Sequence, residues 1–238
     1  MKSLPPLRIV VLLATLSSAA GSASATLTPL SSPAQITDGL TLNFDGYPDR
    51  TIANSLFATE GIIFTRDDSA SIFLLDFNAA GRVTTSPNNV IATISGSGVS
   101  IWATHLNVLS STPLSAAGAY FGNDQADPDF TRIRMSVFGV SNNLLGSVDV
   151  AANNNTSVDQ FIGLQSDVPF SRIRFDNLTS SGNQSLLYSV ILDDFVFATA
   201  TVPEPANLTL VGFGLALLGL STSRRRPGRS SAGGLGSL

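Results

Sequence analysis

Few side chains in this sequence could carry out catalysis. His105 is the only histidine, and the chain contains no cysteine. Zinc sites made of several imidazoles, thiolate metal sites and cysteine proteases are therefore excluded. A serine hydrolase would need His105 as its base, yet the G-x-S-x-G turn of such enzymes does not occur. Glycosidase chemistry needs paired carboxylates, and Glu60 is the only glutamate before residue 204. We therefore expect no enzymatic activity.

Two adjacent acids, Asp193 and Asp194, lie in an apolar segment that ends at Phe197. If this segment is a strand, successive side chains point to opposite faces, so one carboxylate lies on the core side. An unpaired buried carboxylate is costly. A calcium ion, an arginine, or hydrogen bonds from a neighbouring loop would each remove that cost. The residues themselves leave these alternatives open.

Three further acids, Asp124, Asp127 and Asp129, lie around Pro128 in a polar stretch. Their spacing does not reproduce an EF-hand loop, which also requires a glycine and a terminal glutamate. We expect a solvated turn at this position.

Aromatic side chains offer a different chemistry. Trp102, Tyr47 and Tyr120 could stack on sugar rings if they were exposed, because an aromatic face offers flat apolar contact. Packing in the core is the interpretation that we favour for each of them.

The elements that would position these residues read as strands. Short apolar or alternating segments recur between clusters of Asn, Ser, Gly and Pro, and good helix formers such as Lys and Glu are scarce. We predict an all-β, antiparallel, jelly-roll-like β-sandwich, because two packed sheets hide most strand edges. The expected strands are Leu40 to Asp45, Gly61 to Thr65, Ser71 to Phe77, Val99 to Ala103, Ala119 to Phe121, Ile133 to Val140, Gly146 to Val150, Gln160 to Leu164, Ser171 to Phe175 and Tyr188 to Phe197.

The charge of the chain excludes one class of partner. Between Thr26 and Pro203 there are seven arginines and sixteen acids, so this body carries a net charge of −9. Nucleic acid needs a basic surface, whereas an acidic body suits solubility outside the cell or divalent cations. Four of the arginines lie in two Arg-Ile-Arg segments, at 132–134 and 172–174, a pattern typical of half-exposed strands.

The N-terminus has the pattern of a secretory signal peptide. Lys2 and Arg8 precede an apolar run over residues 9–16, and small residues follow up to Ala23 and Ala25. We predict that residues 1–25 are a signal peptide and that signal peptidase cuts after Ala25. Eight strongly apolar residues are too few to span a membrane.

The C-terminal segment carries three features in a row: the motif Pro203, Glu204 and Pro205, the uncharged stretch 206–223, and the cluster Arg224, Arg225 and Arg226. Eighteen residues at about 1.5 Å each form a helix of roughly 27 Å, close to the ~30 Å hydrocarbon core of a bilayer. Flanking arginines resist translocation, so we expect a single transmembrane helix with the body outside the cytoplasm.

This order of features resembles the PEP-CTERM sorting signal of Gram-negative and related bacteria, which the membrane peptidase exosortase recognises. The resemblance implies that residues 200–226 are the sorting signal, that an inner-membrane precursor is processed, and that the product reaches the cell surface or the extracellular space. We assign residues 26–39 to a linker, 40–199 to the β-sandwich, and the polar residues 227–238 to a disordered tail.

The body resembles the sandwich domains often found ahead of such signals, which are similar to the jelly rolls of carbohydrate-binding modules. The resemblance rests on Thr41 to Tyr47, Gly61 to Phe64, Ala119 to Asp124, Phe161 to Leu164 and Ile191 to Phe195. Many such modules hold a structural calcium between an acid of the first strand and one of the last. The matching positions are Asp45 and one of Asp193 or Asp194.

These resemblances imply an exported, non-enzymatic protein with a structural or adhesive role linked to exopolysaccharide or biofilm. Exosortase, signal peptidase and the membrane are its expected partners, and polysaccharide is a further candidate. The alternatives are a carbohydrate-binding module and a glycan-acting enzyme. A binder should show an exposed aromatic row, and an enzyme a cleft with converging carboxylates.

Overall fold

The computed structural model describes residues 24–93, 105–122, 131–153, 155–184 and 189–201. Over these ranges the chain is all-β, as predicted, and contains no α-helix. The strands are β1 (Leu27–Leu30), β2 (Leu40–Leu42), β3 (Ile62–Arg66), β4 (Phe73–Asp76), β5 (Val83–Thr84), β6 (Asn89–Ala92), β7 (Leu106–Gly122), β8 (Arg132–Gly139), β9 (Leu144–Ala151), β10 (Ser157–Leu178) and β11 (Ile191–Thr199). Short 3-10 helices occur at η1 (Pro33–Gln35), η2 (Ala58–Glu60) and η3 (Asn78–Ala80).

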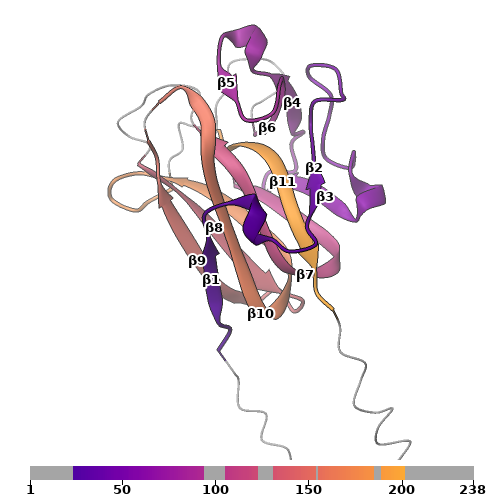
Figure 1. Ribbon diagram of the computed structural model, residues 1–238, viewed down its shortest axis with the longest axis vertical. Coiled ribbons are helices and arrows are strands. Elements are labelled where there is room, and N and C mark those ends of the chain that lie inside the picture. Colours follow the sequence, from indigo (N-terminus) through magenta and orange to yellow (C-terminus); the bar gives the residue numbers. More distant parts are fainter. Residues whose placement is uncertain (1–23, 94–104, 123–130, 154, 185–188, 202–238) are drawn as a thin grey trace, which may run out of the picture.

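Two long strands, β7 and β10, run through both layers of a β-sandwich (Figure 1). The first part of β7 pairs with β3 and with the end of β10, which continues to β8 and β9. The second part of β7 pairs with β11 and with the start of β10, and β1, β2, β6 and β4 extend this layer. All these pairings are antiparallel, and β5 adds a short parallel pair with β10.

The change of layer occurs where the pairing of β7 with β10 loses its regular register, between Gln165 and Arg172 of β10. Each strand carries a proline there, Pro113 in β7 and Pro169 in β10. Proline cannot donate to a strand ladder, so it is tolerated where the ladder is interrupted. One sheet therefore bends over itself, and its two halves enclose the core.

The core between the two layers is rich in phenylalanine. Inward-facing residues of β3, β7, β8, β10 and β11 form its main cluster. Tilted or edge-to-face contacts join the rings of Phe44, Phe57, Phe64 and Phe195, whose centroids lie 5.6–6.1 Å apart. Each fully buried phenylalanine contributes about 1.5–3 kcal/mol. A core of this kind supplies the stability of a domain that has no disulfide.

Residues 26–39 do not form a linker. Strand β1 pairs with β10, and η1 begins with a capping box in which Ser32 and Gln35 bond reciprocally to the backbone. Leu30 and Ile36 pack with Phe161 on the outer surface of the sheet, in a second apolar cluster. The linker assignment was wrong because Leu30 and Ile36, six residues apart, show no strand-like alternation in the sequence. Their burial depends on the sheet surface beneath them, which the sequence does not reveal.

The strand predictions were correct in type but not in extent. The segments expected at 160–164 and 171–175 belong to the single strand β10, and the short strand expected at 119–121 is the end of the 17-residue β7. Strands β1, β5 and β6 were not predicted. The polar residues at the two bends resemble loop sequences, which is why the long strands were divided or shortened. The strand expected at 99–103 lies outside the described residues.

Candidate functional site

The two adjacent acids lie at a β-bulge in β11. Between Asp193 and Val196 the pairing with β7 shifts by one residue, and Asp194 adopts a φ of 44°. An extra residue in a left-handed conformation is what a bulge requires, and Asp tolerates that conformation better than most residues. The bulge interrupts the strict alternation that we expected, and it leaves both carboxylates within electrostatic reach of Asp45.

Asp193 is fully buried, on the sheet face that it shares with Ile191 and Tyr120, opposite to the main core. Its two carboxylate oxygens accept hydrogen bonds from Ser86, one from the backbone N–H at 2.8 Å and one from the hydroxyl at 2.6 Å. Burial raises the pKa of this carboxyl group, and the bonds from Ser86 oppose that effect. A neighbouring loop therefore satisfies this buried acid with hydrogen bonds, which is one of the three alternatives that the sequence left open.

Asp45 ties the first part of the sandwich to the same loop. Its Oδ1 accepts the backbone N–H groups of Asn88 and Asn89 at 2.8 and 2.9 Å. The side chain of Asn89 in turn donates to the backbone carbonyls of Phe44 and Tyr47. The loop before β6 is thus joined to both acids that the resemblance selects, and the sequence alone does not reveal this because such backbone bonds leave no pattern.

Two buried oxygens in this carboxylate cluster, defined as Asp45, Asp193 and Asp194, lack a hydrogen-bond partner: Oδ2 of Asp45 and Oδ1 of Asp194. Burial and the charges of Asp193 and Asp45 raise the pKa of Asp194 to about 6. A cation near the two free oxygens would satisfy both and relieve the repulsion. Hard carboxylate oxygens suit calcium, which also requires backbone carbonyls or water to complete its shell.

The described residues contain no group of three acidic or imidazole side chains gathered in a metal-ligand arrangement. Both carboxylate oxygens of Asp193 accept hydrogen bonds from Ser86. Asp45 and Asp194 are therefore the side chains that could hold the ion. The donor set therefore fits a weak site with two carboxylates, and calcium at the cluster stays a prediction.

His105 lies between two aspartates, Asp176 and Asp67. Its Nδ1 contacts the carboxylate of Asp176, and its Nε2 is 3.4 Å from Asp67. Burial and the nearby guanidinium groups of Arg174 and Arg172 lower the pKa of the imidazole, while Asp67 acts in the opposite direction. Both ring nitrogens thus face carboxylates, and within the described part of the chain no hydroxyl group bonds to either of them.

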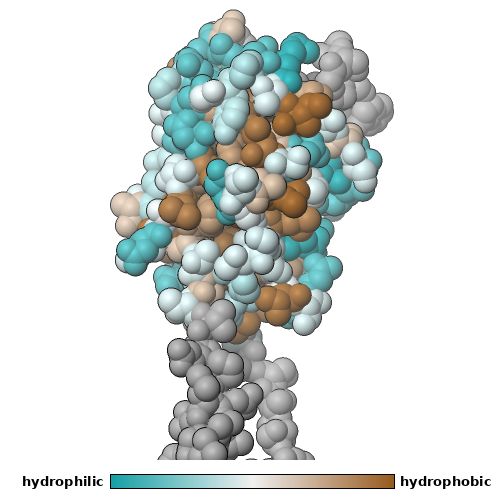
Figure 2. Space-filling model, turned by 90° about the vertical axis from the view of Figure 1, so that its right-hand side faces the viewer, coloured by the Kyte–Doolittle hydropathy of each residue, from teal (hydrophilic) through white to brown (hydrophobic). Residues whose placement is uncertain are grey.

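Of the three aromatic side chains that could stack on sugar rings, the structure describes two. Tyr47 and Tyr120 are both partly buried, and each packs edge-to-face against a phenylalanine, Phe57 and Phe161 respectively. Trp102 lies outside the described residues, as do Asp124, Asp127 and Asp129. Among the described residues, the exposed large hydrophobic side chains are all aliphatic: Leu40, Ile52, Ile63, Val83, Val140 and Leu144. Figure 2 shows one side of the molecule, where hydrophobic patches are separated by polar surface.

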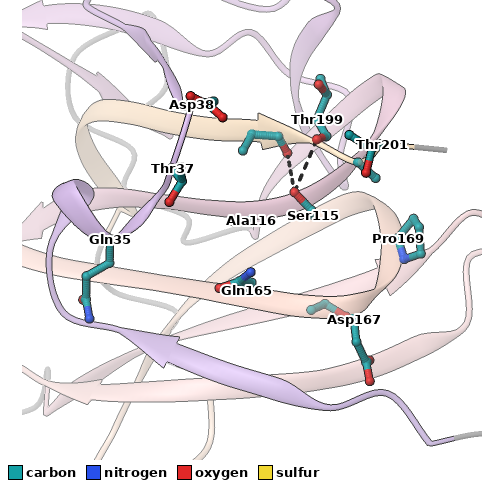
Figure 3. Close-up of a pocket in the computed structure, with 13 residues that line it drawn as sticks. Gln35, Thr37, Asp38, Ser115, Ala116, Gln165, Asp167, Pro169, Thr199 and Thr201 are labelled. Atoms are coloured by element: carbon teal, nitrogen blue, oxygen red, sulfur yellow. Dashed lines mark hydrogen bonds between the residues drawn. The ribbon is translucent and has the colours of Figure 1, made fainter. Parts of the chain in front are cut away.

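A polar pocket of about 590 Å³ lies where the two ends of the domain meet (Figure 3). The segment after β1, the bends of β7 and β10, and the end of β11 line it with hydroxyl, amide and carboxylate groups. Ser115 donates weakly to the carbonyls of Ala198 and Thr199, both at 3.4 Å. The lining includes Asp38 and Asp167 but no basic side chain. Such a pocket suits neutral polyols better than anions.

Both ends of the described chain approach this pocket, through Asp167, which bonds to Thr26, and through Thr199 to Thr201. The bond after Ala25 lies in irregular chain directly before β1, and the backbone N–H of Thr26 donates to Asp167 at 2.7 Å. At the other end, β11 stops at Thr199, four residues before the Pro-Glu-Pro motif. Ala23, the motif, the stretch 206–223, the arginine cluster and the tail lie outside the described residues. Within the described ranges, no helix has the length and apolarity to cross a membrane.

No family model and no curated protein sequence matches the chain. Three solved structures share parts of its shape. The K2 cleaved adhesin domain of Lys-gingipain covers 68% of this chain and 99% of its own at 12% identity and a TM-score of 0.45. An arabinose-bound α-L-arabinofuranosidase covers 68% of this chain and 26% of its own, at 11% identity and a TM-score of 0.42. A DUF4465 family protein from Bacteroides caccae covers 74% of this chain and 100% of its own, at 14% identity and a TM-score of 0.37. At these TM-scores no function is transferred.

Proposed function

We propose that this protein is an exported, exosortase-processed component of the bacterial cell surface or extracellular matrix, with a structural or adhesive role and no enzymatic activity. The observation that carries the proposal is the C-terminal order of a Pro-Glu-Pro motif, an uncharged stretch of 18 residues and three arginines. The A-x-A site at Ala23 and Ala25 supports export independently. A jelly-roll connectivity of the sandwich is part of the proposal.

The end of the folded domain supports this reading of the motif. Strand β11 ends at Thr199, so only a few residues separate the sandwich from Pro203. Two prolines around Glu204 remove backbone donors and restrict φ, which favours an extended segment that a membrane peptidase can reach. Cleavage there would release or transfer a sandwich that keeps all of its described strands.

Mass spectrometry of the matrix and membrane fractions tests the proposal. In a strain with exosortase, the mature protein should begin at Thr26 and should lack residues 206–226. In a strain without exosortase, the protein should stay in the membrane fraction with its C-terminal segment attached. Mature matrix protein that retains residues 206–226 would leave only an ordinary membrane anchor and would overturn the sorting assignment.

A carbohydrate-binding module is the second candidate, and the polar pocket between the domain ends favours it. Hydroxyl and amide groups of Thr37, Ser115 and Gln165 could bond to a neutral sugar. A glycan array should then show binding to neutral glycans that Gln165→Leu abolishes. A glycan-acting enzyme is less well supported. His105 contacts two aspartates, and the lining of the pocket holds no histidine or basic side chain beside its two acids, Asp38 and Asp167.

A further inference from the structure

Four of the seven arginines of the body lie on one outer face of the sandwich. In β8 and β10 the residues between them, Ile133 and Ile173, are buried in the core. Because strand side chains alternate, the four arginines point away from the core on neighbouring antiparallel strands. We define the arginine face as Arg132, Arg134, Arg172 and Arg174.

This face is basic on a molecule that is otherwise strongly acidic. Two aspartates neutralise part of it: Asp149 forms a two-pronged pair with Arg134 at 2.7 and 2.9 Å, and Asp176 accepts from Nε of Arg174 at 3.0 Å. Arg132 lies 3.8 Å from the same Asp149. Four guanidinium groups, the carboxylates of Asp149 and Asp176, and Asp67 at the edge of the face leave one positive charge here, whereas the whole body carries −9.

Within the arginine face, Arg172 is the residue whose charge is least compensated. Its guanidinium carbon lies 3.6 Å above the ring centre of Phe138, and its Nη1 makes only a long bond of 3.4 Å to Asn107. Its Nε is buried without a partner, and no carboxylate forms an ion pair with it among the described residues. Burial and the charge of Arg174 lower the pKa of Arg172. An aromatic stack orients a guanidinium but does not neutralise it.

We propose that the arginine face binds a carboxylate-bearing polysaccharide, with Arg172 and Arg174 holding one carboxylate between them. Residues two apart on one strand face are about 7 Å apart, so a carboxylate placed between them can accept from both guanidinium groups. The planar fork of arginine matches a carboxylate better than lysine does. Arg134 and Arg132 continue the basic row along β8 toward the next acidic sugar.

The density of charge favours a glycan over nucleic acid. Duplex DNA carries a charge about every 1.7 Å, and such a polymer would be repelled by the acidic surface around a small basic face. A uronic acid polymer carries one charge per sugar and can place single carboxylates on the arginines. The exposed Asp67, whose charge acts on Arg172, lies at the edge of the face and opposes any anion.

The choice of a polysaccharide rests on the proposed export, but the binding measurement does not. Purified full chain in detergent is titrated into fluorescent oligogalacturonate, and anisotropy reports binding. We expect Arg172→Gln and Arg174→Gln each to weaken binding about 10-fold, the effect of losing one charge-assisted hydrogen bond. Asp67→Asn should tighten binding. Arg50→Gln, an equal change of charge at an exposed site elsewhere, should leave it unchanged.

Further controls separate the alternatives. Arg172→Lys keeps the charge but not the fork and should bind with intermediate affinity, and circular dichroism verifies that each variant folds. Equal binding of the methyl-esterified oligomer, or unchanged binding by both glutamine variants, would overturn the proposal. Tighter arginine-dependent binding of single-stranded DNA would assign the face to nucleic acid instead. Self-association that Arg172→Gln abolishes would make it an interface between copies. None of these results depends on processing by exosortase, which is measured separately.

Discussion

At the scale of single residues, Asp194 combines three unfavourable features. It has a left-handed backbone, a buried oxygen without a partner, and a carboxyl pKa raised to about 6 by burial and by its neighbours Asp193 and Asp45. Since this pKa is higher in the folded than in the unfolded state, the folded state binds the proton more tightly. The contribution of Asp194 to stability is therefore present at low pH and is lost as the pH rises from about 4 through about 6.

Replacing Asp194 with asparagine should stabilise the calcium-free protein at pH 7.5 by about 1–2 kcal/mol, with little effect at pH 4. Asparagine keeps the shape and tolerates the left-handed conformation. Denaturant unfolding of both proteins across this pH range measures the difference. Added calcium should reverse the order, because the ion stabilises only the protein that retains the carboxylate. Parallel pH profiles, unchanged by calcium, would show that the carboxylate cluster holds neither a trapped charge nor a metal.

The hydrogen bond from Thr26 to Asp167 leads to a second prediction at this scale. If signal peptidase cuts after Ala25, the nitrogen 2.7 Å from Asp167 becomes an α-ammonium group. The bond from Thr26 already lowers the pKa of Asp167. In the processed protein we expect an α-amino pKa above the ~8 of a free N-terminus.

Titration of the processed protein by NMR measures this α-amino pKa. The stabilisation is present below about pH 8 and is lost as the pH rises through the raised value. Asp167→Asn should return the α-amino pKa to the ordinary range, whereas Asp159→Asn, a change at another exposed acid, should not. An ordinary value in the unmodified protein would mean that the ammonium group does not meet Asp167.

At the scale of elements, the close approach of β7 and β10 depends on glycine. A Cβ atom on Gly122 would lie 2.1 Å from the carbonyl oxygen of Ser157 and 2.7 Å from the Cα of Val158. These are backbone atoms of the paired strand, so they cannot move aside without breaking the ladder. Nothing lies within 4 Å of the corresponding position on Gly46.

Gly122→Ala should therefore destabilise the domain by about 2–4 kcal/mol, and Gly46→Ala should change stability by no more than about 0.5 kcal/mol. Thermal and denaturant unfolding of the two variants tests the contrast. A tolerated alanine at residue 122 would indicate that the two strands can separate there at little cost.

The outcome of the strand predictions depends on how each strand shows itself in the sequence. Arg-Ile-Arg at 132–134 alternates between polar and apolar residues because the arginines are half-buried and the isoleucine is buried. The strand that contains it, β8, was therefore predicted correctly. Strand β6 was missed because both of its faces are buried, so it has no alternation. Strand β10 was divided because its bend, around Pro169, has the composition of a loop.

The carboxylate cluster was predicted in part for the same reason. Alternation predicts that one of the two acids points into the main core, whereas the buried acid, Asp193, lies on the opposite sheet face beneath the loop of Ser86. The bulge at Asp194 and the bonds from Ser86 depend on how a distant loop packs, and neither leaves a local pattern. Tertiary hydrogen bonds leave no periodic pattern in the sequence, whereas burial of one strand face in the main core does.

At the scale of the whole molecule, the proposed sorting depends on a short segment just beyond the domain. Replacing Glu204 with glutamine should leave the precursor in the membrane, because the anionic group between the two prolines is lost. Arg229→Gln, in the C-terminal tail, should be processed normally. Immunoblots of membrane and matrix fractions measure both. Normal release of the Glu204 variant would show that this carboxylate is not read.

The position of β11 determines how the domain would respond to a pull on its C-terminus. This strand lies inside the sheet, with β7 on one side and β2 and β6 on the other. Tension applied beyond Thr199 acts along the strand and loads the hydrogen bonds on both sides together, in shear. A terminal strand at the edge of the sheet would instead open one bond at a time. While it is held by its C-terminal segment, the sandwich would therefore resist flow and drag far better than its equilibrium stability suggests.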